Sequence, residues 1–467
     1  MRLAFQKPVF YVAAFCAAFY VALPCSAQTQ AAPLPAGIEQ ASTVEGFTEY
    51  RLPNGLKVLL FPDPSKPTVT VNMTYLVGSR HENYGETGMA HLLEHLLFKG
   101  STNYTNITQG FNQRGMRPNG TTGLDRTNYF ESFQASDDNL KWALGMEADR
   151  MVNSFIAQKD LDMEMTVVRN EYERGENSPF GVLYKRMQSV AFDWHNYGNS
   201  TIGNRSDIEN VKLENLRAFY RTYYQPDNAV LLVSGKYDVA QTLDWINGFF
   251  GKIPKPTRTL PQQWTTEPTQ DGERSFMVRR KGDVQLVAIA YKIPAVLHPD
   301  NLAAQFVGSI LTHAPNGRLY KELVETGKAT QVFAFPFGGV APGLAFIGAN
   351  VKKGEPIEAV RDALAVAMEN FDKNPPTTEE MDRVRRDSAN AQEKFLNDPE
   401  RIGTGMSEYI ALGDWRFFFY DRDRTAKVTA EQVVAAAKTY FRRDNRTTGI
   451  FVPEDEPQRA DIAAAPS

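Results

Sequence analysis

Residues able to bind a metal ion gather in one short stretch near the start of the chain. The segment GMAHLLEHLLFKGST, residues 88–102, places His91, Glu94 and His95 within five positions of a chain that has only 6 histidines. On a helix, residues four apart share a face, so His91 and His95 could direct both imidazoles at one ion. Glu94 lies one step away on the same side. This spacing predicts a metal site.

The surrounding residues favour a buried helix. Gly88 stands near its start, Leu92, Leu93 and Leu96 cover its other sides, and a Lys-Gly pair at 99–100 is typical of a helix end. Two histidines and a carboxylate buried together need partners, because an unpaired buried charge is costly. A metal ion would supply them. The alternative is that they are core residues hydrogen-bonded to the backbone and to each other.

A catalytic zinc site takes three protein ligands and leaves one position open for water, so two histidines leave one ligand to be found. The best source is the acidic, strongly helical stretch EMTVVRNEYERGEN, residues 164–177. Glu164 and Glu171 are seven residues apart and fall on the same helix face. Spacing alone leaves Glu164, Glu171, Glu173 and Glu176 open as the third ligand.

Two parts of the chain share residue patterns at a fixed offset. The shared patterns include probable strands, which are elements that could position the metal motif. The stretches YYQPDNAVLLVSG and YFRRDNRTTGIFV share Tyr, Asp and Asn at an offset of 217, as between Tyr223 and Tyr440. A probable strand at 69–80 has a counterpart at 284–294, about 215 residues later. Two pairs at nearly one offset favour a duplicated domain.

The predicted fold class is α+β, with two related domains from an internal duplication, each a mixed or antiparallel sheet packed with helices. With 467 residues, 42% hydrophobic and 23% charged, the chain has the composition of a folded protein of two or more domains. The predicted segments are a signal peptide at 1–27, an N-terminal metal-binding domain at 28–250, a proline-rich linker at 251–274, a C-terminal domain at 275–455 and a disordered tail at 456–467.

The first residues match a secretory signal, with a short basic start, an apolar run from Val9 to Leu23 and cleavage expected after Ala27. The run is shorter than the roughly 20 residues that span a bilayer, which disfavours a membrane anchor. Lipid modification of Cys25 is a minor alternative. Both cysteines lie inside this segment, so the mature chain would have no disulfide and no cysteine nucleophile. We expect a periplasmic or secreted protein without stable membrane insertion.

The net charge and its distribution give no support for a nucleic-acid or anionic-membrane partner. Removing residues 1–27 takes away Arg2 and Lys7, which leaves 49 basic residues against 55 acidic ones and a net charge of −6. The chain has no long basic run, so nothing favours a nucleic-acid or anionic-membrane partner.

The motifs together resemble the pitrilysin/insulinase family of zinc metallopeptidases, in the short two-domain bacterial type similar to mitochondrial processing peptidase subunits. The H-x-x-E-H spacing is the inverted zinc-peptidase motif. The resemblance is carried by HLLEH with Glu171 placed 76 residues after His95, and by residues 78–100, 119–130 and 219–238.

The resemblance implies roles for individual residues. His91, His95 and Glu171 would bind one Zn²⁺ per chain, and Glu164 would orient a ligating histidine. Glu94 would act as general base towards a zinc-activated water. Asn119 would lie on a strand edge beside the metal and hold the substrate backbone. From sequence alone, Asn119-Gly120 reads more simply as a turn.

The resemblance also implies a clamshell of two domains, of which the second carries no metal motif. The segment corresponding to HLLEH falls near 306–313, where the chain reads FVGSILTH. Relatives use an Arg and a Tyr of the second domain to hold the substrate carbonyl, and here Arg318 and Tyr320 do not match that spacing. A homodimer or a heterodimer with a related subunit could supply the pair.

Two functions are therefore expected. The first is a zinc-dependent endopeptidase that hydrolyses peptides or unfolded segments. The alternative is a non-catalytic or partner-dependent subunit of a heterodimeric peptidase or peptide-binding assembly. The complete set of His91, Glu94, His95 and Glu171 favours the enzyme, because a structural subunit has little need of all four.

Overall fold

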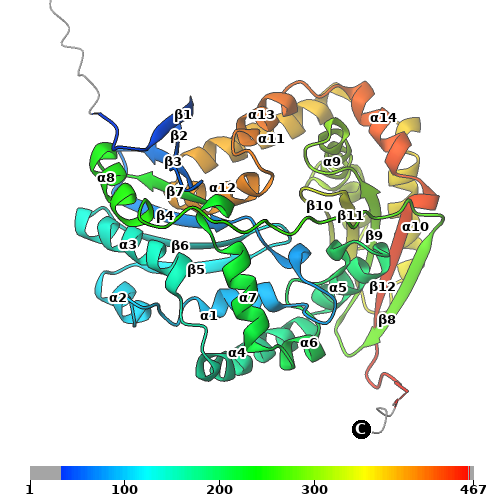
Figure 1. Ribbon diagram of the computed structural model, residues 1–467. Helices are drawn as coiled ribbons and strands as arrows, with labels where there is room; N and C mark the ends of the chain where they lie inside the picture. The colour runs from blue at the N-terminus through cyan, green and yellow to red at the C-terminus, as the bar shows by residue number, and fades with distance from the viewer. Residues whose placement is uncertain (1–32, 461, 463–467) are drawn as a thin grey trace, which may run out of the picture. The chain divides into compact units, whose positions relative to one another are not determined.

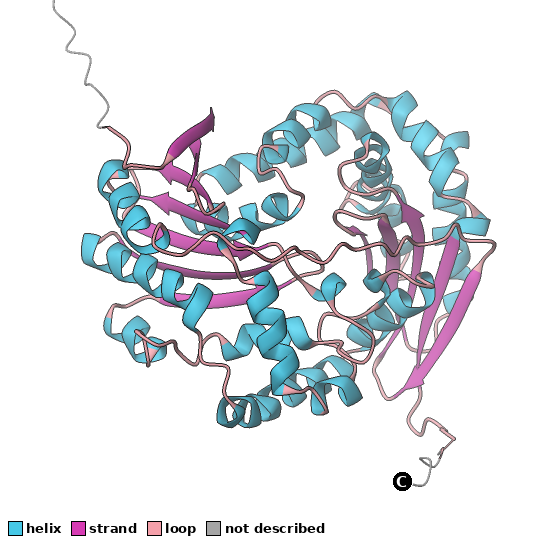
Figure 2. Cartoon of the chain, in the orientation of Figure 1, coloured by secondary structure: helices cyan, strands magenta, loops and turns pink. Residues whose placement is uncertain are grey.

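Two β-sheets organise the chain in a computed structural model that describes residues 33–460 and 462 (Figures 1 and 2). The predicted signal peptide and the end of the predicted tail lie outside the described residues. The N-terminal sheet has the order β1-β2-β3-β7-β4-β6-β5, and the C-terminal sheet has the order β10-β11-β9-β12-β8. The strands are β1 (Glu39–Val44), β2 (Phe47–Arg51), β3 (Lys57–Pro62), β4 (Thr68–Tyr75), β5 (Arg117–Thr122), β6 (Thr127–Gln134), β7 (Ala229–Gly235), β8 (Arg274–Arg280), β9 (Val284–Ile293), β10 (Gln331–Phe337), β11 (Gly343–Lys352) and β12 (Arg446–Pro453).

The two sheets repeat one topology. The strand order β3-β7-β4-β6-β5 of the first matches β8-β12-β9-β11-β10 of the second, and in each the only parallel pair is the first one, β3 with β7 and β8 with β12. We call the segment from β3 to β7, Lys57–Gly235, the first repeat, and the segment from β8 to β12, Arg274–Pro453, the second repeat. The predicted α+β fold with an internal duplication is confirmed.

The recurring Tyr and Asn have the same structural role in both repeats. Asn228 donates to the carbonyl of Tyr223 at 3.0 Å, and Asn445 donates to the carbonyl of Tyr440 at 2.8 Å. Each Asn ends a short 3₁₀ turn that leads into the central strand β7 or β12. The residues shared by the two segments therefore form the turn that precedes the last strand of each repeat.

Helices cover both faces of each sheet. Strand β7 is buried at every position, as expected for a central strand packed on two sides. The helices of the first part are α1 (Met89–Leu96), α2 (Ile107–Gln113), α3 (Asp137–Asn153), α4 (Gln158–Glu176), α5 (Pro179–Ala191), α6 (Arg205–Glu209), α7 (Leu213–Tyr223) and α8 (Val239–Phe250). Those of the second are α9 (Pro299–Thr312), α10 (Ile357–Glu369), α11 (Thr378–Leu396), α12 (Pro399–Ala411), α13 (Phe417–Thr425) and α14 (Ala430–Tyr440). None of the helices in the described residues is both long enough and apolar enough to cross a membrane.

The repeats exchange helices. Helix α12, from the second repeat, packs its Ile402 and Met406 against Phe47 and Leu232 of the N-terminal sheet. Helix α5, from the first repeat, covers the C-terminal sheet, and its Leu183 lies in one core with residues of β9, β11 and β12. Each repeat thus completes the hydrophobic core of the other. Residues 251–273 connect α8 to the second repeat and contain no helix or strand.

One contact in the exchanged core leads to a stability prediction. The Trp415 Nε1 donates to Glu49 Oε2 at 2.7 Å, and both side chains are buried. Trp415→Phe keeps an aromatic ring in the core, but it removes a donor from a buried carboxylate and leaves part of the indole's space empty, which is expected to cost at least about 1–3 kcal/mol in free energy of unfolding. The measurement is the urea midpoint of unfolding. Trp264→Phe is the control, because Trp264 is 78% exposed. Equal midpoints for the two variants would contradict the role of this bond.

Candidate metal centre

Helix α1 carries the H-x-x-E-H motif and begins at a glycine that no other residue could easily replace. Gly88 is its N-cap with φ of +91°, and a Cβ there would stand 2.6 Å from the Ile202 carbonyl oxygen. The buried carboxylate of Glu82 accepts the backbone N–H groups of Gly88 at 3.0 Å and Ala90 at 2.8 Å. Burial raises the pKa of Glu82 to about 8 although both N–H donors oppose the shift. These contacts fix the start and direction of α1.

The structure brings three predicted ligands together. His91 Nε2 lies 3.3 Å from His95 Nε2, and Glu171 Oε2 lies 3.6 Å from the first and 3.5 Å from the second. His91 and His95 come from α1, and Glu171 comes from α4. Among the described residues, this is the one cluster of three or more His, Cys, Asp or Glu side chains close enough to share a metal ion.

These distances fit a tetrahedral zinc site. With zinc–ligand bonds of about 2.0–2.2 Å, ligand atoms at the corners of a tetrahedron are about 3.3–3.6 Å apart. The three separations between ligand atoms fall in this interval. Burial lowers the pKa of His91 to about 4, helped by the neighbouring His95, so the ring is neutral at pH 7. A neutral imidazole is the form that binds a metal.

Glu164 lies behind the site and not in it. Its Oε2 is 3.0 Å from His95 Nδ1, and its Oε1 is paired with the Lys99 ammonium. Burial alone would raise the pKa of Glu164, but the hydrogen bonds from Lys99 and His95 lower it overall. A carboxylate at Nδ1 holds the proton there and turns the Nε2 lone pair towards the cluster.

The Glu94 carboxylate contacts strand β5. Thr122 Oγ1 donates to Glu94 Oε2 at 2.6 Å. A Cβ added at Gly120 would stand 2.8 Å from Glu94 Oε1, so the carboxylate lies directly against the backbone of this strand. Burial raises the pKa of Glu94, and the hydrogen bond from Thr122 only partly offsets this.

Strand β5 forms an exposed edge beside Glu94. It is the last strand of the N-terminal sheet and pairs only with β6, where Asn119 lies opposite Phe130. Asn119 is exposed, and its Oδ1 accepts the N–H of Gly120 at 2.9 Å. The interpretation of Asn119-Gly120 as a turn is wrong, because both residues lie inside the strand.

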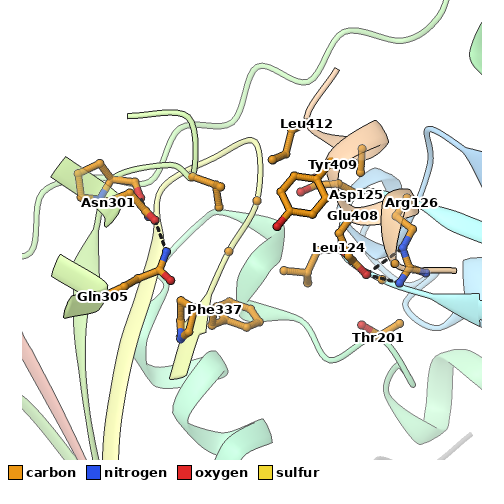
Figure 3. Close-up of a pocket in the computed structure, with 18 of the residues that line it drawn as sticks. Leu124, Asp125, Arg126, Thr201, Asn301, Gln305, Phe337, Glu408, Tyr409 and Leu412 are labelled. Atoms are coloured by element: carbon orange, nitrogen blue, oxygen red, sulfur yellow. Dashed lines mark hydrogen bonds and ion pairs between the residues drawn. The ribbon is translucent and has the colours of Figure 1, made fainter. Parts of the chain in front are cut away.

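Strand β5 leads directly into a cavity of about 670 Å³ (Figure 3). Both repeats line it, in agreement with the clamshell predicted from the sequence. Figure 3 shows Phe337 and Tyr409 at its walls, and Arg126 bonded to Glu408. Asp125 accepts the Tyr197 hydroxyl at 2.6 Å and the Val340 N–H at 3.2 Å, which ties the β5–β6 turn to the second repeat.

The two second-repeat residues considered from the sequence are engaged elsewhere. Arg318 pairs with Glu380 at 2.7 Å and donates to the carbonyls of Asn374 and Pro375. Tyr320 begins a single turn of π-helix, Tyr320–Val324, and packs at the edge of the second repeat's core. Arg318 therefore anchors the start of α11.

Sequence reasoning missed several residues that shape the centre. Thr122 and Glu82 were not singled out, and Lys99 and Gly120 were considered only as a helix end and a turn residue, although each contacts or would contact a motif residue or the helix that carries it. The only signal in the sequence was the small-residue run NGTTG at 119–123, which allows the close approach to Glu94.

Two family models match the chain. "Insulinase (Peptidase family M16)" matches residues 57–205, which include the whole cluster, and "Peptidase M16 inactive domain" matches residues 210–387. The second match covers α9, whose sequence has no metal motif where α1 has HLLEH.

Curated relatives carry names that agree with these matches. The chain is 28% identical over 414 residues to "Zinc protease PqqE" of Helicobacter pylori, covering 86% of this chain and 91% of the relative. It is 31% identical over 420 residues to an "Uncharacterized zinc protease" of Rickettsia felis, covering 88% and 98%. Among solved structures, a protease from Helicobacter pylori superposes with a TM-score of 0.82 at 27% identity, covering 87% of this chain and 99% of that one.

Proposed function

Because this chain belongs to the insulinase (M16) family of peptidases, we propose that it is a zinc-dependent endopeptidase with one zinc held by His91, His95 and Glu171. The observation that carries the proposal is the spacing of the three ligand atoms, 3.3–3.6 Å, which matches a tetrahedral zinc site. Two histidines and a carboxylate can also bind manganese or cobalt, so zinc rests on the family and on the ligand types.

When bound, zinc supplies a Lewis acid that brings the pKa of a water molecule to about 7 and polarises the scissile carbonyl. The other steps belong to side chains of this protein. Glu94 takes the proton of the attacking water and returns it to the leaving amine. Since Thr122 occupies Glu94 Oε2, Oε1 is the atom that receives this proton. Glu164 keeps His95 in the tautomer that presents Nε2.

The substrate is a peptide or an unfolded segment that adds to the exposed edge of β5. Main-chain hydrogen bonds to an edge strand tolerate many sequences, and Asn119 is placed to contact the added backbone. Residues beyond the scissile bond would enter the cavity next to Thr122, with its walls of Phe337 and Tyr409 (Figure 3). The predicted secretory signal supports a periplasmic or extracellular location for this activity.

Metal removal tests the proposal on the chain from Gln28 to Ser467. We expect about one zinc per chain by mass spectrometry and hydrolysis of an internally quenched peptide. A chelator should abolish hydrolysis, and zinc should restore it, because the site then regains its Lewis acid. Absence of bound zinc would refute the metal centre.

Zinc bound without hydrolysis would instead support the alternative of a partner-dependent subunit. This alternative is favoured by one observation, that Arg318 is held by Glu380 and does not face the cavity. Measuring the mass of the active species in solution would then decide between a homodimer and a requirement for a second, related chain.

A further inference from the structure

The part of α4 that carries Glu171 has few apolar anchors of its own. Val168 is the last fully buried residue of the helix, and every residue from Arg169 to Glu176 is half-buried or exposed. Helix α5 starts immediately afterwards, with Ser178 as N-cap and Pro179 as its first residue. The position of Glu171 therefore depends on the polar contacts that hold the end of α4.

The strongest of these contacts comes from the other repeat. Arg280, the last residue of β8, donates from Nη1 to Glu176 Oε2 at 2.7 Å and to the Glu176 carbonyl oxygen at 3.1 Å. Lys185 of α5 binds the other carboxylate oxygen, Oε1, at 3.2 Å. Although burial opposes it, the bond from Arg280 and the charge of Lys185 lower the pKa of Glu176, so it is ionised and fully paired at neutral pH.

A guanidinium that binds both the side chain and the main-chain carbonyl of the last helical residue fixes that residue in position and direction. It also places a positive charge at the negative end of the helix dipole. Glu176 is five residues after Glu171, about 7.5 Å along the helix axis. A shift of Glu176 is therefore transmitted to Glu171 within one and a half turns of rigid helix.

We propose that Arg280 is a positioning residue for the metal ligand Glu171, acting through Glu176 at the end of α4. The second repeat, whose α9 lacks the motif, thus contributes to metal affinity through this contact. The inference rests on the proposed role of Glu171 and adds the contact between repeats on which that role depends.

The test is the zinc dissociation constant of the full mature chain, measured by competition with a chromogenic chelator. Removing a group that orients a metal ligand typically weakens metal binding about 10–100-fold, and for Arg280→Gln we expect roughly 10-fold. Glu176→Gln should weaken binding in the same direction, and the losses from the two single changes should not add fully in the double variant, because both changes remove the ion pair between Arg280 and Glu176.

Two controls separate this role from general stability. Arg279→Gln changes the neighbouring residue of β8, which pairs with Glu454 and not with α4, so its zinc affinity should be unchanged. Trp415→Phe lowers stability in a core cluster that contains no residue of α1 or α4, so this variant should also bind zinc normally at denaturant concentrations below its unfolding range. If Arg280→Gln binds zinc as tightly as the wild type, the positioning role is wrong. If the wild type itself binds no zinc, the proposed function fails instead.

Discussion

Glu94→Gln is expected to remove peptide hydrolysis while zinc stays bound. No atom of Glu94 belongs to the three proposed ligands, so replacing its carboxylate by the glutamine amide leaves the metal centre intact. It cannot accept a proton from the attacking water, and loss of a general base typically lowers the rate about 10²–10⁴-fold. Because glutamine has the shape of glutamate, the hydrogen bond from Thr122 can be kept through the amide oxygen. The measurement combines kcat for a quenched peptide with metal content.

The control for this variant is Glu393→Gln, the same chemical change at an exposed position of α11. It should leave both hydrolysis and zinc content as in the wild type. Hydrolysis at the wild-type rate by zinc-loaded Glu94→Gln would remove Glu94 from the mechanism. Loss of zinc from this variant would show that its carboxylate takes part in metal binding.

Glu171→Ala is expected to lose both zinc and hydrolysis. Only two histidines would remain, and a catalytic zinc site requires three protein ligands. We expect zinc affinity to fall by more than about 100-fold, beyond the range typical of groups that only orient a ligand. Titration with a competing chelator measures this directly, without dependence on any substrate.

Glu173→Ala is the informative comparison, because it changes the same residue type two positions away on the same helix. The Glu173 side chain is 58% exposed and lies 4.0 Å from Arg205. Its removal should leave zinc affinity unchanged. The reverse pattern, with Glu173→Ala losing zinc and Glu171→Ala keeping it, would show that the third ligand has been assigned to the wrong glutamate.

The sequence was informative where local rules decide the structure. The strands expected at 69–80 and 284–294 correspond to β4 and β9, and the recurrence of Tyr223 and Tyr440 predicted a duplication whose two sheets have the same strand order. The third ligand could not be chosen by spacing, since a helix pattern does not say which face meets α1. The resemblance selected Glu171, and the roles of His91, His95, Glu94, Glu164 and Asn119 stay predictions.

The exchange of helices could not be read from the sequence. The apolar faces of α5 and α12 show that each helix is covered, but not which sheet covers it. Arg280 was missed for the same reason, because its partner Glu176 lies 104 residues away in the other repeat. Periodicity describes one element at a time, whereas these contacts depend on how two repeats fit together.

The exchanged helices also set the order in which the protein can fold. Glu49 and its partner Trp415 are 366 residues apart, and one face of the N-terminal sheet is covered by α12 and α13. During synthesis this face stays open to water until almost the whole chain has left the ribosome. Contacts between such distant segments form slowly, because the chain loses conformational entropy before the contacts can stabilise the folded state. The first repeat therefore exposes this apolar face until the segment that contains α12 and α13 has been made.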